Sequence, residues 1–225
     1  MLNWAVRYFP ILRVLRRYAF GTGTVLEVGS GSFGLARFYR GQVVGCDVNF
    51  PDPPQDNMLP VRCSGTRLPF TDCSFEAVVA SDVLEHVAPE LRREVIHEAL
   101  RVTRRMAVFA FPSGEDAHAM DERFLDFHRK RGISPPPWLQ EHVQYPFPEK
   151  DLFLGLVDGW TIESYGNEHV RFHDWVNHGE MSRYWGAVFR ASLRFTPRLL
   201  EAGLRLMDRA PFYRIIVIAT RRTKE

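Results

Sequence analysis

Cysteine is scarce in this chain. Cys46, Cys63 and Cys73 are the three present among 225 residues, and no two of them form a CxxC pair. An odd number of cysteines without paired spacing indicates neither a disulfide framework nor a cysteine-based zinc site. We therefore expect reduced thiols and a cytoplasmic protein.

Long apolar runs are missing as well. No stretch approaches the roughly 20 apolar residues that a membrane-spanning helix requires. Arg7, Pro10 and Arg13 interrupt the start of the chain, so it lacks the apolar core of a signal peptide. Hydrophobic residues make up 45% and charged residues 25%, which is typical of a globular protein. The length of 225 residues favours a single domain, 1–225, with accessory segments.

The chain also lacks an excess of charge of one sign. The 29 Lys and Arg residues nearly balance the 27 Asp and Glu residues, which gives no argument for a nucleic-acid partner, and we expect none. Both ends are nevertheless basic, in residues 1–20 and 181–225. A solvated basic face is one interpretation, and an anionic membrane surface or a phosphate-bearing substrate is the other.

Short apolar segments alternate with helical segments along the chain. Strands are predicted at 25–29, 43–47, 61–63, 75–81, 106–111, 160–165 and 213–220. Helical segments are predicted at 1–20, 33–39, 89–104 and 149–156. This alternation predicts a doubly wound α/β fold.

Two stretches, 113–147 and 167–211, exceed what a minimal sheet needs. Each follows a predicted strand at its carboxyl end, where ligands bind in open α/β sheets, so we expect them to form a cap on the acceptor side of the cleft. The first stretch carries Phe124, Phe127 and Trp138, which suit a sugar or an aromatic ring. A plain packing cap is the alternative.

The second stretch is predicted to contain two helices separated at Thr196 and Pro197, which can cap and begin a helix. Each helix carries a stripe of arginines: Arg183, Arg190 and Arg194 in the first, and Arg198, Arg205 and Arg209 in the second. A solvated side opposite an apolar, core-facing side is one interpretation. Contact with an anionic membrane surface is the other.

A glycine-rich turn follows the first predicted strand, in residues 25–34 (VLEVGSGSFG). Glycines let the backbone turn sharply and approach a ligand closely. Glu27 lies inside the apolar strand, where a carboxylate needs a positive or hydrogen-bonding partner. Asp47 ends the second strand at the spacing expected of a carboxylate that accepts hydrogen bonds from ribose hydroxyls, with a solvated strand end as the alternative.

Two further segments follow in order, residues 68–79 (LPFTDCSFEAVV) and 81–87 (SDVLEHV). Together with the glycine-rich turn, they resemble the class I S-adenosylmethionine-dependent methyltransferases of the type 11 methyltransferase domain family. The resemblance extends over residues 23–112. It implies a Rossmann-like, mostly parallel seven-stranded sheet with an antiparallel last strand and helical insertions over the cofactor cleft. It also implies S-adenosyl-L-methionine as the cofactor and a small-molecule acceptor.

The resemblance assigns the cofactor-binding residues. They are Glu27, Gly29, Ser30, Gly31 and Gly34 in the turn, Asp47 and Val48 after the second strand, Ser64, Gly65 and Thr66, and Ser81, Asp82 and Leu84. The residues of the turn would surround the methionine part of the cofactor. Asp47 and Val48 would contact the ribose and the adenine, and Ser81, Asp82 and Leu84 would lie under the sulfonium. Related proteins often have an Asp where Ser64 stands here, so one adenine contact would pass to the backbone of the next two residues.

Methyl transfer from a sulfonium requires an aligned acceptor, and a hydroxyl acceptor must also lose its proton. His86 is the candidate catalytic base, and a structural hydrogen-bonding role is its alternative. His169 and His173 are four residues apart, but no third ligand has a suitable spacing. We therefore expect a surface pair there and no metal site.

The expected function is methyl transfer to a small molecule, such as an oxygen of a glycan or of a lipid-linked intermediate. Contact with the inner face of a membrane would follow from the basic helices. A non-catalytic cofactor-binding or regulatory protein is one alternative. A nicotinamide-dependent oxidoreductase is another, since dinucleotide enzymes share the glycine-rich turn, but the segments 68–79 and 81–87 have no role there.

Overall fold

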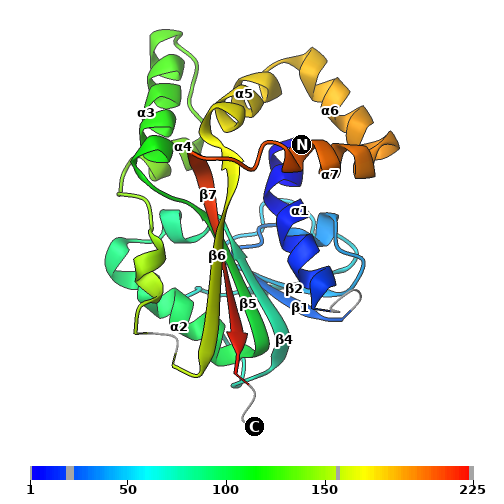
Figure 1. Ribbon diagram of the computed structural model, residues 1–225, viewed down its shortest axis with the longest axis vertical. Coiled ribbons are helices and arrows are strands. Elements are labelled where there is room, and N and C mark those ends of the chain that lie inside the picture. Colours follow the sequence, from blue (N-terminus) through cyan, green and yellow to red (C-terminus); the bar gives the residue numbers. More distant parts are fainter. Residues whose placement is uncertain (1, 19–22, 156–157, 223–225) are drawn as a thin grey trace.

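A seven-stranded sheet forms the centre of the computed structural model, which describes residues 2–18, 23–155 and 158–222 (Figure 1). The strand order is β3-β2-β1-β4-β5-β7-β6. The strands are β1 (Val25–Val28), β2 (Val43–Asp47), β3 (Met58–Arg62), β4 (Phe75–Ser81), β5 (Thr103–Pro112), β6 (Trp160–His169) and β7 (Phe212–Arg221). The last strand, β7, runs antiparallel to both neighbours, and the other paired strands are parallel. The predicted fold class is confirmed.

Helices surround this sheet. They are α1 (Leu2–Arg17), α2 (Arg92–Val102), α3 (Glu115–Lys130), α4 (Pro137–His142), α5 (Val170–Glu180), α6 (Arg183–Phe195) and α7 (Pro197–Arg205). Short 3-10 turns are η1 (Leu35–Arg37), η2 (Leu84–His86), η3 (Pro89–Leu91) and η4 (Lys150–Phe153). No helix within the described ranges is both long enough and apolar enough to cross a bilayer.

The two faces of the sheet bury separate apolar layers. On one face α1 packs its buried side chains against β1, β2 and β4, and α5, α6 and α7 in turn contact α1. On the other face α2 and η4 cover β4 and β5. Strand β1 is buried throughout because it lies between these layers, as expected of a parallel strand with near-continuous apolar side chains.

The predicted insertions form helices beyond one edge of the sheet. Figure 1 shows α3 and α5 at the end where β7 begins, which is the carboxyl end of the parallel strands. A third apolar cluster holds this cap together, with Met120, Phe124, Leu139, Val170 and Tyr213 among its members. The sheet therefore presents its carboxyl edge to the underside of the cap.

Several predicted elements differ from the structure. Residues 33–39 form a turn around η1 rather than a helix, because Gly34 has a φ of 42°, outside the helical region, and the Leu35 N–H donates to the buried Glu27 carboxylate. The third strand begins at Met58, and residues 149–156 contain only η4 within the described part. The stretch 167–211 holds three helices rather than two. The predicted ends at Phe20 and Leu156 lie outside the described residues.

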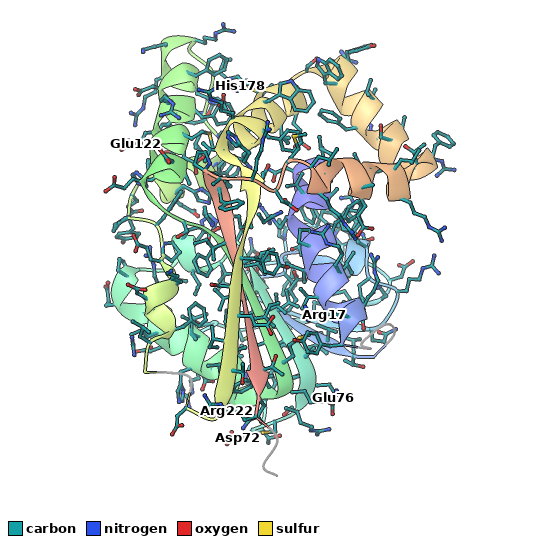
Figure 2. All side chains as sticks on the ribbon, in the orientation of Figure 1. Arg17, Asp72, Glu76, Glu122, His178 and Arg222 are labelled. Atoms are coloured by element: carbon teal, nitrogen blue, oxygen red, sulfur yellow. The ribbon has the colours of Figure 1, made fainter. Side chains whose placement is uncertain are left out.

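The opposite end of the molecule is polar. Figure 2 shows Asp72, Glu76 and Arg222 there, far from His178 in the cap. Exposed ion pairs join Arg104 to Glu76 and Arg101 to Asp72 with N–O distances of 2.6 and 2.7 Å. The first pair joins β5 to β4, the second joins α2 to the loop that precedes β4, and both lie away from the carboxyl edge of the sheet.

Candidate active site

The glycine-rich turn leaves β1 with three glycines in the left-handed region. Gly29, Gly31 and Gly34 have φ values of 72°, 52° and 42°, which side-chain-bearing residues rarely adopt. A Cβ atom at Gly29 would also collide with the Val83 side chain, and one at Gly34 with the Glu27 carboxylate. The turn therefore requires glycine at both positions for conformation and for space.

Glu27 holds this turn from behind. Its side chain is fully buried, and its carboxylate accepts hydrogen bonds from the Tyr8 hydroxyl (2.8 Å) and the Leu35 N–H (2.6 Å). Burial raises the pKa of Glu27 to about 7, although these two donors and Arg7 oppose the shift. The sequence predicted that this buried carboxylate needs donors, and the protein itself supplies them.

Asp47 ties the second strand to the turn. Its carboxylate accepts hydrogen bonds from the Gly31 N–H at 2.7 Å and from the Asn49 N–H at 3.0 Å. Gly29 N–H in turn donates to the carbonyl of Cys46 at 2.7 Å. These bonds place the carboxyl ends of β1 and β2 side by side at the sheet edge.

A cavity of about 500 Å³, the cofactor cavity, opens at this edge. Eight of the predicted site residues line it: Gly29, Asp47, Val48, Ser64, Gly65, Thr66, Asp82 and His86. The hydroxyls of Ser64 and Thr66 bond each other at 2.8 Å. Sequence reasoning missed several lining residues, among them Cys46, Cys63, Val83, Val87 and Glu141.

The remaining predicted residues lie behind the lining. Glu27 and Gly34 contact each other under the turn, and the Ser30 hydroxyl donates to the carbonyl of Gly31 at 2.9 Å. Ser81 and Leu84 are buried, with Leu84 inside an apolar cluster. These residues shape the cavity wall and do not face its volume.

A second cavity of about 500 Å³, the cap cavity, lies under the insertions. Its walls come from α1, α3, α4, α5 and β7, with Trp4, Phe124, Trp138 and Tyr213 as aromatic members. Asp82 and His86 line both cavities. The two spaces are therefore adjacent, with these two side chains between them just beyond the end of β4.

Residues 26–111 match a protein-family model described as a methyltransferase domain. This part of the chain is a methyltransferase domain. The match confirms the resemblance predicted from the three sequence segments, and it spans β1 to β5, the strands that frame the cofactor cavity.

Curated relatives match part of this chain. An uncharacterized methyltransferase of Mycobacterium sp. (strain KMS) is 41% identical over 95 residues, which are 37% of this chain and 36% of that protein. The counterpart from strain JLS is 40% identical over the same length. The match thus spans about a third of the length of these curated relatives.

Two solved structures share the fold at low identity. Phosphoethanolamine N-methyltransferase 2 of Haemonchus contortus superposes with a TM-score of 0.55 at 16% identity, over 96% of this chain and 53% of that one. Magnesium protoporphyrin IX methyltransferase of Synechocystis superposes with a TM-score of 0.53 at 14% identity, over 96% and 82%. The first was solved with phosphomonomethylethanolamine and S-adenosylhomocysteine and the second with bound S-adenosylhomocysteine.

A charged clamp closes the methyltransferase domain against α1 and β7. Asp82, which has a φ of 50°, accepts two hydrogen bonds from Arg214, both at 2.8 Å, and lies 2.9 Å from Arg7. Arg214 also donates to Glu168 at 3.0 Å. Burial by itself raises the pKa of Asp82, but Arg214 and Arg7 outweigh it and hold the pKa below its usual range. Both arginines lie outside the recognised motifs, so the sequence did not indicate them.

Two histidines meet between the cavities. The Nε2 atoms of His86 and His142 are 3.3 Å apart, and the Nδ1 atom of His86 lies 2.6 Å from the carboxylate of Glu141. Burial and His142 lower the pKa of His86. The neighbouring Glu85 is almost fully buried, and its burial raises its pKa, with the charge of Asp82 as a further cause.

His169 and His173 were predicted to form a surface pair, and this prediction is wrong for His173. His173 is buried, lies 3.0 Å from the carboxylate of Glu168 and stacks on Tyr213 with ring centroids 3.5 Å apart. His169 caps α5 by accepting a hydrogen bond from the Arg171 N–H. The apolar positions around His173 gave no sign that a buried carboxylate faces it from β6.

Proposed function

We propose that the protein is an S-adenosylmethionine-dependent methyltransferase that methylates an oxygen of a small, hydroxyl-bearing molecule and releases S-adenosylhomocysteine. The adjacency of the two cavities at Asp82 and His86 carries this proposal. Ligands of open α/β sheets bind outside the carboxyl ends of the strands, where the cofactor cavity lies. The cap cavity then offers the acceptor direct access to the methyl group.

In this proposal each part of S-adenosylmethionine contacts the residues that the resemblance predicts for it. Asp47 and Val48 hold the ribose and the adenine, and the backbone around Gly29 approaches the methionine part. Ser64, Gly65 and Thr66 border the adenine end of the same cavity. The glycine conformations and the carboxylate of Asp47 are already fixed by hydrogen bonds, which lowers the ordering cost of binding.

The acceptor side supports a small organic molecule. One solved neighbour named above contains phosphomonomethylethanolamine, and the other is named for magnesium protoporphyrin IX. Both of these compounds are small molecules. The cap cavity here combines aromatic walls with Arg7, Glu180 and Arg214. Aromatic faces beside charged groups suit the ring and hydroxyls of a sugar. We propose a glycan or a lipid-linked intermediate as the acceptor.

His86 is the residue that we propose to activate the acceptor. It lines both cavities, and its imidazole is about a quarter exposed, with a side-chain accessibility of 27%. As the methyl carbon moves, its bond to sulfur breaks and a bond to the acceptor oxygen forms. The hydroxyl proton of the acceptor passes to the Nε2 atom of His86, whose Nδ1 atom lies 2.6 Å from the Glu141 carboxylate.

A panel assay tests the activity. Purified protein is incubated with S-adenosylmethionine and hydroxylated sugars, nucleotide sugars or lipid-linked saccharides, and released S-adenosylhomocysteine is measured. We expect release with at least one such acceptor and loss of release in Trp138→Ala, because Trp138 lines the cap cavity and packs against the ring of His142. Binding of the donor without turnover on any acceptor would favour the non-catalytic alternative, and binding of a nicotinamide dinucleotide in its place the oxidoreductase.

Helices α6 and α7 support the membrane part of the proposal. Six arginines of this region, the two predicted stripes, are all exposed. Large apolar side chains are exposed beside them, with Tyr184, Phe195, Leu199 and Leu206 each more than 70% accessible. Packing of the apolar side against the core explains the buried Leu204, but it does not explain why the four exposed apolar side chains face solvent. Apolar and basic side chains together are typical of helices that lie on anionic bilayers.

Vesicle co-sedimentation tests this surface. We expect binding to vesicles that contain phosphatidylglycerol, weaker binding at high salt, and little binding to phosphatidylcholine alone. The double variant Phe195→Glu and Leu199→Glu should release the protein from the anionic vesicles. Equal sedimentation of the variant, or no sedimentation of the wild type, would remove the proposed location at the inner membrane face while leaving the methyltransferase proposal intact.

A further inference from the structure

A cluster of three side chains lies where the two cavities adjoin. Glu85 and His86 belong to η2, and His142 ends α4 in the cap. One ligand atom from each residue, the Nε2 atoms of the histidines and a carboxylate oxygen, lies within 4.8 Å of the others. Glu85 and His142 are buried, whereas His86 is partly exposed to the cavities.

Hydrogen bonds fix the orientation of both imidazoles. The Nδ1 atom of His86 lies 2.6 Å from the carboxylate of Glu141, and the Nδ1 atom of His142 lies 2.7 Å from that of Asp121. Carboxylates accept hydrogen bonds, so each Nδ1 carries a proton, and a neutral ring held in this orientation presents its lone pair at Nε2. Metal-binding histidines are typically held in this way, with the second nitrogen donating to a carboxylate.

The two lone pairs face each other. The Nε2 atoms are 3.3 Å apart, and Oε1 of Glu85 lies 3.8 Å from the Nε2 atom of His142. Within the described part of the chain, neither carboxylate oxygen of Glu85 has a hydrogen-bond partner. Three potential ligand atoms thus converge, and a cation or a shared proton between them would offset their mutual repulsion.

We propose that Glu85, His86 and His142 bind a divalent transition-metal ion. Two nitrogen ligands about 2.0–2.1 Å from a zinc ion and separated by a tetrahedral angle lie roughly 3.3–3.4 Å apart. The two Nε2 atoms are 3.3 Å apart, which matches this spacing. Oε1 of Glu85 lies 3.8 Å from the Nε2 atom of His142, so it must move somewhat closer to occupy the third position. Two histidines and one carboxylate leave a further position open, as in catalytic zinc sites.

The site has a consequence that rests on the proposed methyltransferase function. An acceptor hydroxyl bound to the open position would lose its proton to water more readily, because the cation stabilises the alkoxide. The alkoxide oxygen then forms a bond to the methyl carbon, while the carbon–sulfur bond breaks and its electron pair stays on sulfur. While the cation is bound, His86 acts as its ligand and the cation activates the hydroxyl; without the cation, the imidazole of His86 takes the proton as proposed above.

Metal titration of the chelator-treated protein, without a polyhistidine tag, tests the site. We expect one zinc ion per chain by calorimetry and visible absorption of low-coordinate cobalt(II) on titration. His142→Ala and Glu85→Gln should each weaken zinc binding at least about tenfold, as the loss of a ligand requires. His97→Ala is the control, since this histidine is exposed on α2 and should leave zinc affinity unchanged.

X-ray absorption on the zinc-loaded wild type keeps the test independent of how the variants fold, and it should show two imidazole ligands. Absence of zinc binding by the wild type, or equal affinity in His142→Ala, would mean that the histidines share a proton only, and would overturn the site. S-adenosylhomocysteine binding is measured in parallel. Zinc binding without nucleoside binding contradicts the methyltransferase proposal alone, and the reverse result contradicts the metal site alone.

Discussion

At the residue scale, the buried carboxylate of Glu27 makes stability depend on pH. Its pKa rises from 4.5 to about 7 in the fold because burial disfavours the charged form. The neutral carboxyl is therefore favoured by folding, and this stability is present below pH 4.5 and is lost as the pH rises through about 7. The full change amounts to roughly 3 kcal/mol.

We expect Glu27→Gln to remove this slope. The amide oxygen can still accept a hydrogen bond from the Leu35 N–H, and the amide NH₂ can donate one to the Tyr8 hydroxyl. Both hydrogen-bonding partners of this side chain are therefore kept. Urea unfolding at pH 5 and pH 8 measures the difference, with the exposed Glu163→Gln as the control. Equal pH slopes in wild type and Glu27→Gln would contradict the assignment of the buried carboxylate.

Gly29 and Gly203 offer a matched pair of glycine-to-alanine substitutions. A Cβ atom at Gly29 would collide with Val83 at a φ of 72°, whereas one at Gly203 in α7 would meet nothing within 4 Å. We expect Gly29→Ala to lower stability by about 1–3 kcal/mol and to weaken cofactor binding. Gly203→Ala should raise stability by roughly 0.5–1 kcal/mol. Thermal unfolding with and without S-adenosylhomocysteine compares them; similar behaviour of both variants would argue against a strained, cofactor-facing turn.

At the element scale, the clamp around Asp82 joins β4, α1 and β7. Arg214→Met leaves Asp82 and Glu168 buried without their main cationic partner, so we expect a loss of about 3–5 kcal/mol in the free energy of unfolding. Arg104→Met breaks an exposed pair with Glu76 at the opposite end and should cost less than about 1 kcal/mol. Losses of similar size in urea unfolding would show that the clamp does not hold the elements together.

The sequence predicted the central strands because β1, β2, β4 and β5 are largely buried, and therefore apolar, and are bounded by turn residues. The bounds of β2 and β4 follow directly from the runs at 43–47 and 75–81. Residues 33–39 do not form the predicted helix because Gly34 has a φ of 42° and the Glu27 carboxylate of β1 lies against the turn. A contact of this kind between a strand and a turn leaves no periodic trace in the local sequence.

The sequence predicted only part of the candidate site. Asp47, Gly29 and Asp82 line or frame the cofactor cavity because they follow strand ends, which sequence patterns reveal. His142, Arg7 and Arg214 reach the same region from a cap helix, the first helix and the last strand. Their positions depend on how distant elements pack, so spacing along the chain could not indicate them.

At the scale of the whole molecule, the methyltransferase domain supplies one cavity and the surrounding segments supply the other. The family match ends at residue 111, and the cap is built from residues beyond it together with α1. We propose that residues 1–225 act as one methyltransferase domain, with 113–147 and 167–211 as its acceptor-side cap. Donor binding would then depend on the matched part and acceptor choice on the rest.

Isothermal titration calorimetry with S-adenosylmethionine and S-adenosylhomocysteine tests the central claim most directly. We expect binding of one nucleoside per chain to the wild type and to Asp72→Ala, an exposed control at the opposite end of the molecule. Asp47→Ala should weaken that binding at least about tenfold, because it removes the proposed ribose partner and frees the Gly31 N–H. No heat from the folded wild type at millimolar nucleoside, or unchanged affinity in Asp47→Ala, would contradict the account.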